Sequence, residues 1–239
     1  MTATAAPAWP PGFAVHDRGI VPDPKLVAAF RGVPTAVVSD CLGRTIGSRG
    51  LRPYHGDPAL TLCGAALTVR VRPGDNLMIH KALTLARAGD VIVVDGSGDV
   101  SHALMGGLMR LAALARELAG VVVDGSIRDS VEWAEGELPV FARGVSHRGP
   151  TKDGPGEINV PIACAGLSVS PGDLVLGDAD GVVVAAPDRL PTLLEAAREK
   201  LAEEAEQQAH HLASQHDPSL RGRDMERVDA LLRARGCPV

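Results

Sequence analysis

The sequence predicts an α/β domain with a parallel βαβ core, followed by long C-terminal helices. Two continuous apolar runs, within residues 90–97 and 120–126, both end in the letters VDGS. Residues 101–119 between them have apolar side chains at helical spacing, so the pattern indicates a strand, a crossover helix and a second strand, parallel to the first. The third observation is a charged amphipathic stretch after residue 187, which predicts a long helix.

The composition is that of a globular protein: of 239 residues, 45% are hydrophobic and 22% are charged. A net charge of −5 with no basic run argues against nucleic acid as a partner, because phosphate binding needs clustered Lys and Arg. No apolar run approaches the roughly 20 residues of a membrane span, and residues 1–15 lack the pattern of a secretory signal. The four cysteines form no CxxC and are typical of reduced thiols. We therefore expect a cytoplasmic protein with no membrane partner.

The elements before the core are predicted in order along the chain. Residues 1–33 form a proline-rich arm and one short helix, and a second helix begins near Pro34. Residues 60–72 alternate between the two faces of a long strand. A helix follows, with Asp75 as a possible cap and Gly89 at its end.

In the core, the first strand is expected to end at Asp95, and a second helix is expected to begin near Ser126. The crossover helix between the two strands is expected to bury one apolar stripe, formed by Leu104, Leu108, Leu111, Leu114 and Leu118.

The remainder of the chain predicts short strands, a hairpin and two helices. The hairpin turns at residues 171–173 and 178–181, the long helix follows residue 187, and a final helix covers residues 224–235. We divide the chain into an arm with a short helix (1–33), an α/β domain (34–187) and a helical extension (188–239). The extension packs either on its own sheet or on another protomer.

Arg128 and Asp129 directly follow the second apolar strand. An aspartate in the first turn of a helix is favoured by the helix dipole, so capping alone explains Asp129. The helix dipole does not favour an arginine at that position. A bound carboxylate ligand, to which the guanidinium donates two hydrogen bonds, explains the arginine better. A structural surface ion pair is the alternative.

The stretch MGGLM, residues 105–109, places two glycines early in the crossover helix. Glycine lowers helix propensity by about 1 kcal/mol per residue. Either the helix begins near Gly106 and turns its first amides toward an anion, or the glycines allow close helix packing. On the first reading, these amides and Arg128 hold one anionic group from two sides.

Acidic residues gather at the predicted strand ends without a Cys or His pair. Carboxylate oxygens of this kind suit Mg²⁺ or Mn²⁺ with several waters rather than a closed zinc site. The sequence has no GxSxG, no P-loop and no GxGxxG after a strand, which argues against hydrolase-elbow and nucleotide sites. The acids are Asp95, Asp99, Asp124, Asp129 and Glu132.

Several segments together resemble the RraA-like family, over residues 34–187: TAVVSDCLGR, LTVRVRPGDNLMIHKAL, GDVIVVDGSGD, VVVDGSIRD, GPGEINVPIACAG and PGDLVLGDADGVVV. The resemblance is strongest to its class II pyruvate aldolases acting on 4-hydroxy-4-methyl-2-oxoglutarate and 4-carboxy-4-hydroxy-2-oxoadipate. It implies a swivelling β/β/α domain and homotrimers or homohexamers with sites between protomers. It also implies Mg²⁺ or Mn²⁺ and oxaloacetate decarboxylation as a side activity.

The resemblance also implies roles for individual residues. Arg128 would hold the pyruvyl end of a small 2-oxo acid and neutralise its oxyanion, and Asp129 would anchor the metal. The amides of the loop Gly106, Gly107, Leu108 and Met109 would bind the pyruvyl carboxylate.

Two features depart from the family pattern: many relatives have an acid where this chain has Gly107, and the usual tail LA-x-GE reads LASQH, ending in Gln215 and His216. Aldolase relatives also supply a glutamate from a neighbour's C-terminal helix, for which Glu199 is the best match and Glu203 the next. The implied function is a metal-dependent lyase that releases pyruvate from a 4-hydroxy-2-oxo acid. A lyase for another 2-oxo acid is one alternative. The other is the non-enzymatic RraA branch, whose shorter members inhibit a ribonuclease by protein contact.

Overall fold

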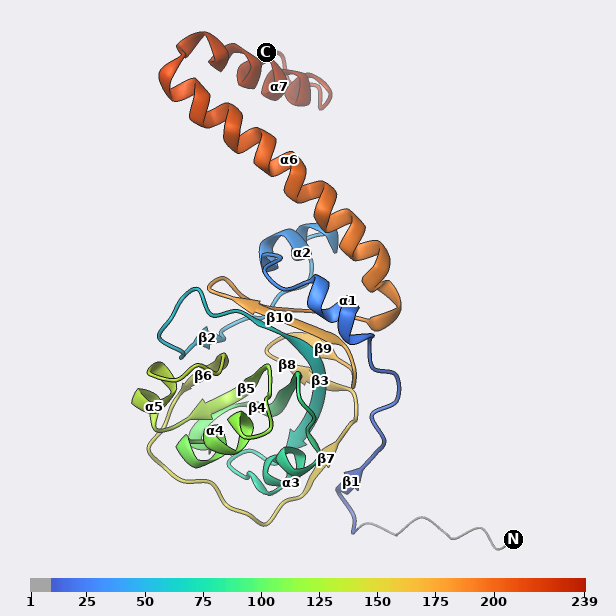
Figure 1. Cartoon of the computed structure of the whole chain (residues 1–239), viewed down its shortest axis with the longest axis vertical. Coiled ribbons are helices and arrows are strands. Elements are labelled where there is room, and N and C mark those ends of the chain that lie inside the picture. The colour runs from blue at the N-terminus through green and yellow to red at the C-terminus, as the bar shows by residue number, and fades with distance from the viewer. Residues whose placement is uncertain (1–9) are drawn as a thin grey trace, which may run out of the picture. The chain divides into compact units, whose positions relative to one another are not determined.

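The computed structural model describes residues 10–239, except for the side chain of Arg223 (Figure 1). Contacts divide the chain into two units, one ending at Leu194 and one running from Glu195 to Val239, and each is described by itself. Within residues 10–239, no helix is both long enough and apolar enough to cross a bilayer.

The first unit contains a nine-stranded mixed sheet and a separate two-stranded ribbon. Its strands are β1 (Phe13–Val15), β2 (Arg52–Pro53), β3 (Leu62–Val71), β4 (Asp90–Met105), β5 (Gly120–Ile127), β6 (Val140–Val145), β7 (Gly156–Ile158), β8 (Ile162–Cys164), β9 (Leu167–Val169), β10 (Leu174–Asp178) and β11 (Gly181–Ala185). The main path runs β1-β7-β3-β4-β5-β6-β2, with β10 beside β3 and β11 beside β10.

The helices follow one another along the chain in the order that the sequence predicts. They are α1 (Pro24–Ala29), α2 (Thr35–Cys41), α3 (Leu77–Leu85), α4 (Gly107–Leu114), α5 (Ser130–Ala134), α6 (Leu190–His216) and α7 (Gly222–Arg233), with 3-10 turns at Pro187–Arg189 and Pro218–Arg221. The parallel pairs β3–β4, β4–β5 and β5–β6 confirm the parallel α/β core.

The central strands are buried on both faces, as continuous apolar runs predict. In β5, Val121 and Val123 pack in the cluster that holds α3, α4 and α5 (Figure 1). Val122, between them, points to the opposite cluster with the β8–β9 ribbon. This alternation fixes β5 tightly, so the residues that follow its carboxyl end are held in a defined place.

The crossover helix differs from the prediction. Strand β4 does not end at Asp95 but continues to Met105, because its pairing with β5 resumes after register shifts. The helix therefore begins only at Gly107, and the predicted apolar stripe is wrong at Leu108 and Leu111, which are 83% and 52% exposed. Strand β5 likewise runs through Ser126, so the helix expected to begin there starts at Ser130.

Other elements match their predictions closely. The N-cap of α3 is Asn76 rather than the predicted Asp75, although the Asp75 side chain, one residue earlier, does accept a hydrogen bond from the Leu77 amide. The hairpin β10–β11 pairs antiparallel around the expected turn at residues 178–181. The final helix lies at Gly222–Arg233 rather than at residues 224–235.

Candidate active site

A cavity of about 110 Å³ lies at the carboxyl ends of β4 and β5. In open α/β sheets, ligands favour this edge of the parallel strands. The cavity brings together the Arg-Asp pair, the start of α4, the start of α3 and the loop before β7. Its lining residues are Asn76, His80, Ala103, Leu104, Met105, Gly106, Leu108, Met109, Arg128, Asp129, Pro150 and Lys152.

The backbone of Arg128 is held on both sides. Its amide donates to the Met105 carbonyl at 2.9 Å, which joins the ends of the two strands. Its carbonyl accepts a hydrogen bond at 3.0 Å from the indole Nε1 of Trp133, a fully buried side chain. The guanidinium itself stays 44% exposed on the cavity, so the backbone is fixed while the charged group remains available.

Asp129 occupies a left-handed backbone conformation, with φ of 58°, immediately before α5. Aspartate tolerates this region better than most residues, and here it turns the carboxylate toward α4. One oxygen, Oδ2, accepts a hydrogen bond from the Gly107 amide at 2.9 Å and lies 3.7 Å from Nε of Arg128. The carboxylate is 40% exposed, so it can also bind a ligand.

The loop at the start of α4 offers fewer free amides than the sequence suggests. The Gly107 amide is taken by Asp129, and the Met109 amide donates to the Gly106 carbonyl at 3.0 Å. Among the hydrogen bonds of the described residues, the Gly106 and Leu108 amides donate to no acceptor. An anion at this helix start would therefore be bound by those two donors.

Gly106 has no room for a side chain. An ideal Cβ there would lie 2.5 Å from Oδ2 of Asp129 and 3.0 Å from Cγ of Arg128. The close approach of the Arg-Asp pair to the loop thus requires a residue without a Cβ. The sequence analysis offered helix packing or a bound anion as the reason for the glycines of this loop. The structure gives a third reason for Gly106, which is its close contact with Arg128 and Asp129.

Three polar residues that the sequence analysis missed complete the opposite wall. The buried Asn76 donates to the Leu104 carbonyl at 3.0 Å, while its Oδ1 has no hydrogen-bond partner among the described residues. Burial lowers the pKa of His80, and the Lys152 ammonium lowers it further, so the imidazole is neutral at pH 7. The spacing of Asn76 and His80, four residues apart on one helix face, is a signal that could have found them.

Asp75 holds the Lys152 loop against α3. Its fully buried Oδ2 accepts from the Thr151 hydroxyl and from the Asp153 amide, both at 2.7 Å, and its Oδ1 accepts from Leu77. Burial alone would raise the pKa of Asp75, but these hydrogen bonds outweigh it and hold the pKa below its ordinary value.

The five acids lie near the strand ends, where Asp95 and Asp124 are cross-strand partners, but the oxygen-rich metal pocket predicted from them is wrong. Buried Asp124 pairs with Arg143 and accepts the Ala165 amide at 2.6 Å, which is a structural role. Asp95 and Asp99 accept hydrogen bonds from residues in their own bulged segment of β4. In residues 10–239, no group of three or more His, Cys, Asp or Glu side chains could hold a metal.

The Asp129 carboxylate alone still fits a hard divalent cation such as Mg²⁺ or Mn²⁺. Mg²⁺ commonly binds through one or two carboxylates and keeps several waters, so it needs no complete protein cage. Asp129 offers a half-exposed carboxylate on an open cavity, and its position is fixed by the Gly107 amide. The residues present therefore fit such an ion, with Asp129 as its anchor.

Glu199 and Glu203 are exposed on α6 in the second unit. That one of these two glutamates enters the active site of a neighbouring protomer stays a prediction.

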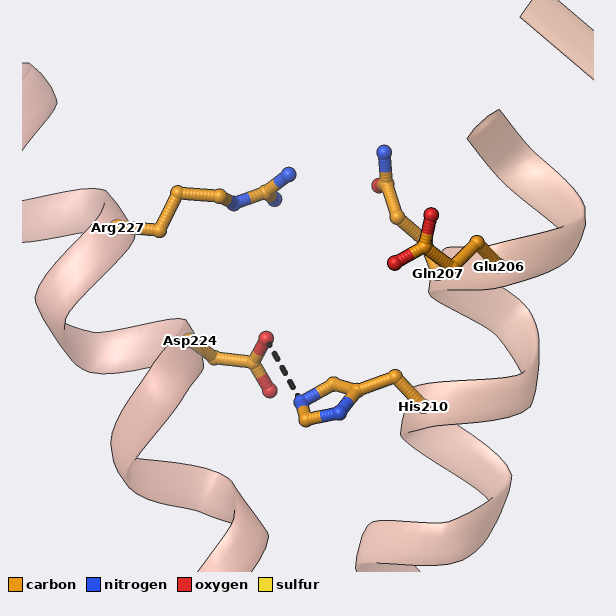
Figure 2. A pocket seen from close by; sticks show the side chains of 5 residues that line it. All are labelled: Glu206, Gln207, His210, Asp224 and Arg227. Carbon is orange, nitrogen blue, oxygen red and sulfur yellow. Dashed lines mark ion pairs between the residues drawn. The ribbon is translucent and has the colours of Figure 1, made fainter. Parts of the chain in front are cut away.

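The second unit has a cavity of its own, of about 190 Å³ (Figure 2). His210 Nε2 lies 3.4 Å from one oxygen of Asp224, and His211 Nδ1 lies 3.5 Å from the other. His210 and His211 thus both contact Asp224 and join α6 to α7, with His210 14% and His211 56% exposed. Glu206, Gln207 and Arg227 line the rest of this cavity.

Comparisons with known proteins agree with this fold. A profile of the RraA-like family, described as Aldolase/RraA, matches residues 35–184, which is more than half of the chain. A protein of Halalkalibacterium halodurans with the provisional name 4-hydroxy-4-methyl-2-oxoglutarate aldolase is 40% identical over 179 residues, covering 74% of this chain and 84% of that one. The 4-hydroxy-4-methyl-2-oxoglutarate aldolase of Thermus thermophilus is 37% identical over 121 residues, covering 51% of this chain and 73% of that one.

A solved structure extends the likeness to three dimensions. The RNA-processing inhibitor RraA from Thermus thermophilus superposes with a TM-score of 0.59 at 32% identity, covering 64% of this chain and 92% of that one. The likeness thus includes proteins named for two different activities. By sequence profile, by its relatives and by its fold, the chain belongs to the RraA-like family.

Proposed function

We propose that the protein is a divalent-metal-dependent lyase that cleaves a 4-hydroxy-2-oxo acid, of the 4-hydroxy-4-methyl-2-oxoglutarate kind, to pyruvate. The observation that carries the proposal is the meeting of Arg128, Asp129 and the start of α4 on one cavity at the strand ends. Relatives named as aldolases of this substrate support the same chemistry.

The cleavage is a retro-aldol reaction. The C3–C4 bond breaks, its electron pair moves into the enolate of pyruvate, and the C4 hydroxyl loses a proton as C4 becomes a carbonyl. Protonation at C3 then gives pyruvate. The charge that must be stabilised develops on the oxygen at C2, so groups aimed at that oxygen carry most of the rate enhancement.

Mg²⁺ or Mn²⁺, held by Asp129, would supply Lewis-acid stabilisation of that oxygen. Arg128 would lie along the same edge of the substrate and neutralise the enolate charge, since a guanidinium binds such oxygens through two parallel hydrogen bonds. The free amides of Gly106 and Leu108 would hold the carboxylate at C1. Oxaloacetate would reach the same enolate by losing CO₂.

The far wall of the cavity suits a substrate with a second carboxylate. Lys152 supplies a cation there, so an anionic group of the substrate meets electrostatic attraction. The only carboxylate among the residues that line the cavity is that of Asp129. A dicarboxylic 4-hydroxy-2-oxo acid would thus be held at both ends.

Assembly into a homotrimer or homohexamer, with sites at protomer contacts, is part of the proposal. Two large apolar side chains are exposed in this part of the chain: Leu108, which lines the cavity, is 83% exposed, and Val131, two residues after Asp129, is 67% exposed. Exposed apolar side chains that gather in one place mark interaction surfaces. Sedimentation should give three or six times the chain mass of 24.8 kDa, and a monomer at micromolar concentration would contradict this part of the proposal.

The test is pyruvate release from a panel of 2-oxo acids. We expect activity with Mg²⁺, its loss in EDTA and its return on adding Mg²⁺ or Mn²⁺. Arg128→Ala and Asp129→Ala should each lose more than about 100-fold, the size of effect seen when one oxyanion-stabilising group is removed. Full activity in chelator would refute the metal role, and full activity of Arg128→Ala would refute the role of the guanidinium.

The rival is a non-enzymatic regulator of ribonuclease activity, favoured by the likeness to the RNA-processing inhibitor. It predicts no pyruvate from any acid of the panel, and inhibition of a ribonuclease by the purified chain. The same preparation serves both assays, so the two functions separate in one experiment.

A further inference from the structure

Two histidines of α6 face one carboxylate of α7. Nε2 of His210 lies 3.4 Å from Oδ1 of Asp224, a contact visible in Figure 2. Nδ1 of His211 lies 3.5 Å from Oδ2, so each carboxylate oxygen faces one imidazole. The two rings are tilted by 59°, with their centroids 5.7 Å apart. All three side chains belong to the second unit, so the contact joins two helices of the same unit.

This contact is incomplete while the imidazoles are neutral. Both distances exceed the range of about 2.7–3.2 Å that is typical of an N–H···O hydrogen bond. Nε2 of His210 is enclosed, yet it makes no hydrogen bond with any residue that the structure describes. An enclosed nitrogen without a partner is unfavourable. A protonated imidazole converts each contact into an ion pair, because Coulomb attraction acts at these distances without ideal hydrogen-bond geometry.

The other charged groups around the histidines come from three elements. On α6, Glu206 lies one turn before His210 and lines the same cavity. On α7, Arg227 lines the cavity beside Asp224 (Figure 2). In the 3-10 turn between the helices, the Arg221 guanidinium donates to a carbonyl of α6 at 3.3 Å. These two arginines oppose protonation of the histidines and Glu206 favours it, so Asp224, the ion-pair partner that both histidines share, sets the direction.

Little apolar burial holds α7 in place. Among residues 198–239, no side chain that the structure describes is buried. The large apolar side chains of α7 stay exposed: Met225 is 68% exposed, Val228 is 49% exposed and Leu231 is 53% exposed. An isolated helix shorter than about 12–15 residues is marginal in water, and α7 has 12. The order of α7 therefore depends on its polar contacts with α6.

We propose that His210, His211 and Asp224 form a pH-sensitive clasp, which holds α7 on α6 when the imidazoles are protonated. Histidine is the side chain that changes charge between about pH 8 and pH 5, whereas an aspartate stays ionised down to about pH 4. The clasp is thus weak in mild alkali, strong in mild acid, and lost again when the carboxylate is protonated. It is independent of the proposed function, because none of its three residues lines the cavity at the strand ends.

Hydrogen–deuterium exchange of the full chain, with sub-second labelling and mass spectrometry, measures the clasp. Protection factors of the peptide that spans α7, corrected for the intrinsic pH dependence of amide exchange, are compared at about pH 8 and about pH 5.5. We expect the protection of α7 to rise about 3- to 10-fold on acidification, the combined effect of two partly exposed ion pairs.

Three variants locate the response. His210→Gln combined with His211→Gln removes both titratable groups and should reduce the response of α7 to less than about 1.5-fold. His211→Gln alone, at a 56% exposed position, should keep about half of the response on a logarithmic scale. His216→Gln is the matched control, because it removes an exposed histidine at the end of the same helix, and it should keep the full response.

Salt tests the nature of the contact. Raising NaCl to about 1 M at about pH 5.5 should lower the protection of α7 in the parent protein toward its value at about pH 8, because salt screens partly exposed ion pairs. Unchanged protection in high salt would show that the contact is not an ion pair and would overturn the clasp.

Each remaining outcome also supports or overturns the clasp. A parent response below about 1.5-fold, or no measurable protection of α7 at either pH, would overturn it. A full response in the double variant would assign the titration to other groups, and loss of the response in His216→Gln would show that it is not specific to the pair. If circular dichroism shows that the double variant loses helix, His211→Gln replaces it, and a full response in that single variant overturns the shared role of the two histidines.

Discussion

Gly106→Ala is the substitution whose effect the structure defines most sharply. The added methyl would lie 2.5 Å from Oδ2 of Asp129, whereas ordinary contact begins at 3.4 Å, so the carboxylate must move by about 0.9 Å. That displacement removes the hydrogen bond from the Gly107 amide and pushes Cγ of Arg128, which is 3.0 Å from the same methyl. The extended backbone at Gly106 is one that alanine adopts freely, so the effect falls on the Arg-Asp pair rather than on the chain.

The expected stability cost is small. Alanine at a helix N-cap is worse than glycine by about 0.5–1.5 kcal/mol, and the half-exposed hydrogen bond to Asp129 adds about 1 kcal/mol. Together these lower Tm by about 4–8 °C in a chain of this size. The activity cost is larger, because a misplacement of about 1 Å at a reacting centre costs about 100-fold in rate.

The assays are pyruvate release with saturating Mg²⁺ and differential scanning calorimetry. Gly47→Ala is the control, since an ideal Cβ at Gly47 meets no atom within 4 Å. It should leave both kcat/KM and Tm unchanged. A Gly106→Ala enzyme that retains half of the parent kcat/KM would refute the placement of Arg128 and Asp129 as the reacting groups.

Three further predictions concern the far wall and the framework. Lys152→Met should lower kcat/KM for a dicarboxylic substrate about 3- to 10-fold. The rate at which pyruvate methyl protons exchange with D₂O should stay within about twofold, because pyruvate has no second carboxylate. An equal effect on both rates would contradict the binding of a second carboxylate by Lys152. Asp75→Asn should lower the free energy of unfolding by about 2–3 kcal/mol in urea at pH 7, because one buried charge-assisted acceptor is lost. Since the pKa of Asp75 is lower in the folded protein than in the unfolded chain, its contribution to the free energy of unfolding is complete above the unfolded pKa and is lost as the pH falls through the folded pKa. The difference in stability between parent and variant should therefore shrink in acid. A difference that does not change with pH would contradict this role of the Asp75 charge. Arg18→Ala should lower the free energy of unfolding, measured in urea, by about 3–5 kcal/mol. The reason is that it leaves buried Asp90, whose Oδ1 accepts from the Arg18 guanidinium at 2.6 Å, without its ion-pair partner. A loss below about 1 kcal/mol would show that the ion pair contributes little to stability.

The parallel core could be predicted because short, valine-rich apolar runs bounded by Gly and Asp are typical of strands buried on both faces. Residues 120–127 illustrate this, since every one of them is buried and the charged pair follows immediately. Residues 96–105 could not be predicted as strand. They are rich in glycine and polar residues, and they join the sheet only through register shifts against β5. Their pairing is a tertiary effect that local periodicity does not contain.

The site was predictable in part for the same reason. Arg128, Asp129 and the glycines of α4 lie close to two strand ends, and the strand ends can be read from the sequence. Asn76 and Lys152 are 76 positions apart and meet through the buried Asp75 and its bonds to the loop at residues 151–153. No local signal in the sequence specifies that bond, so this wall of the cavity appears only in the structure.

The indole of Trp133 gives the protein a built-in optical reporter. It is fully buried and is bonded to the carbonyl of Arg128, so its emission should respond to any ion or acid that shifts the Arg-Asp pair. The sequence has one other tryptophan, Trp9, and replacing it with phenylalanine would leave a single emitter. Occupancy could then be followed by fluorescence quenching in real time, with inert analogues as readily as with substrates.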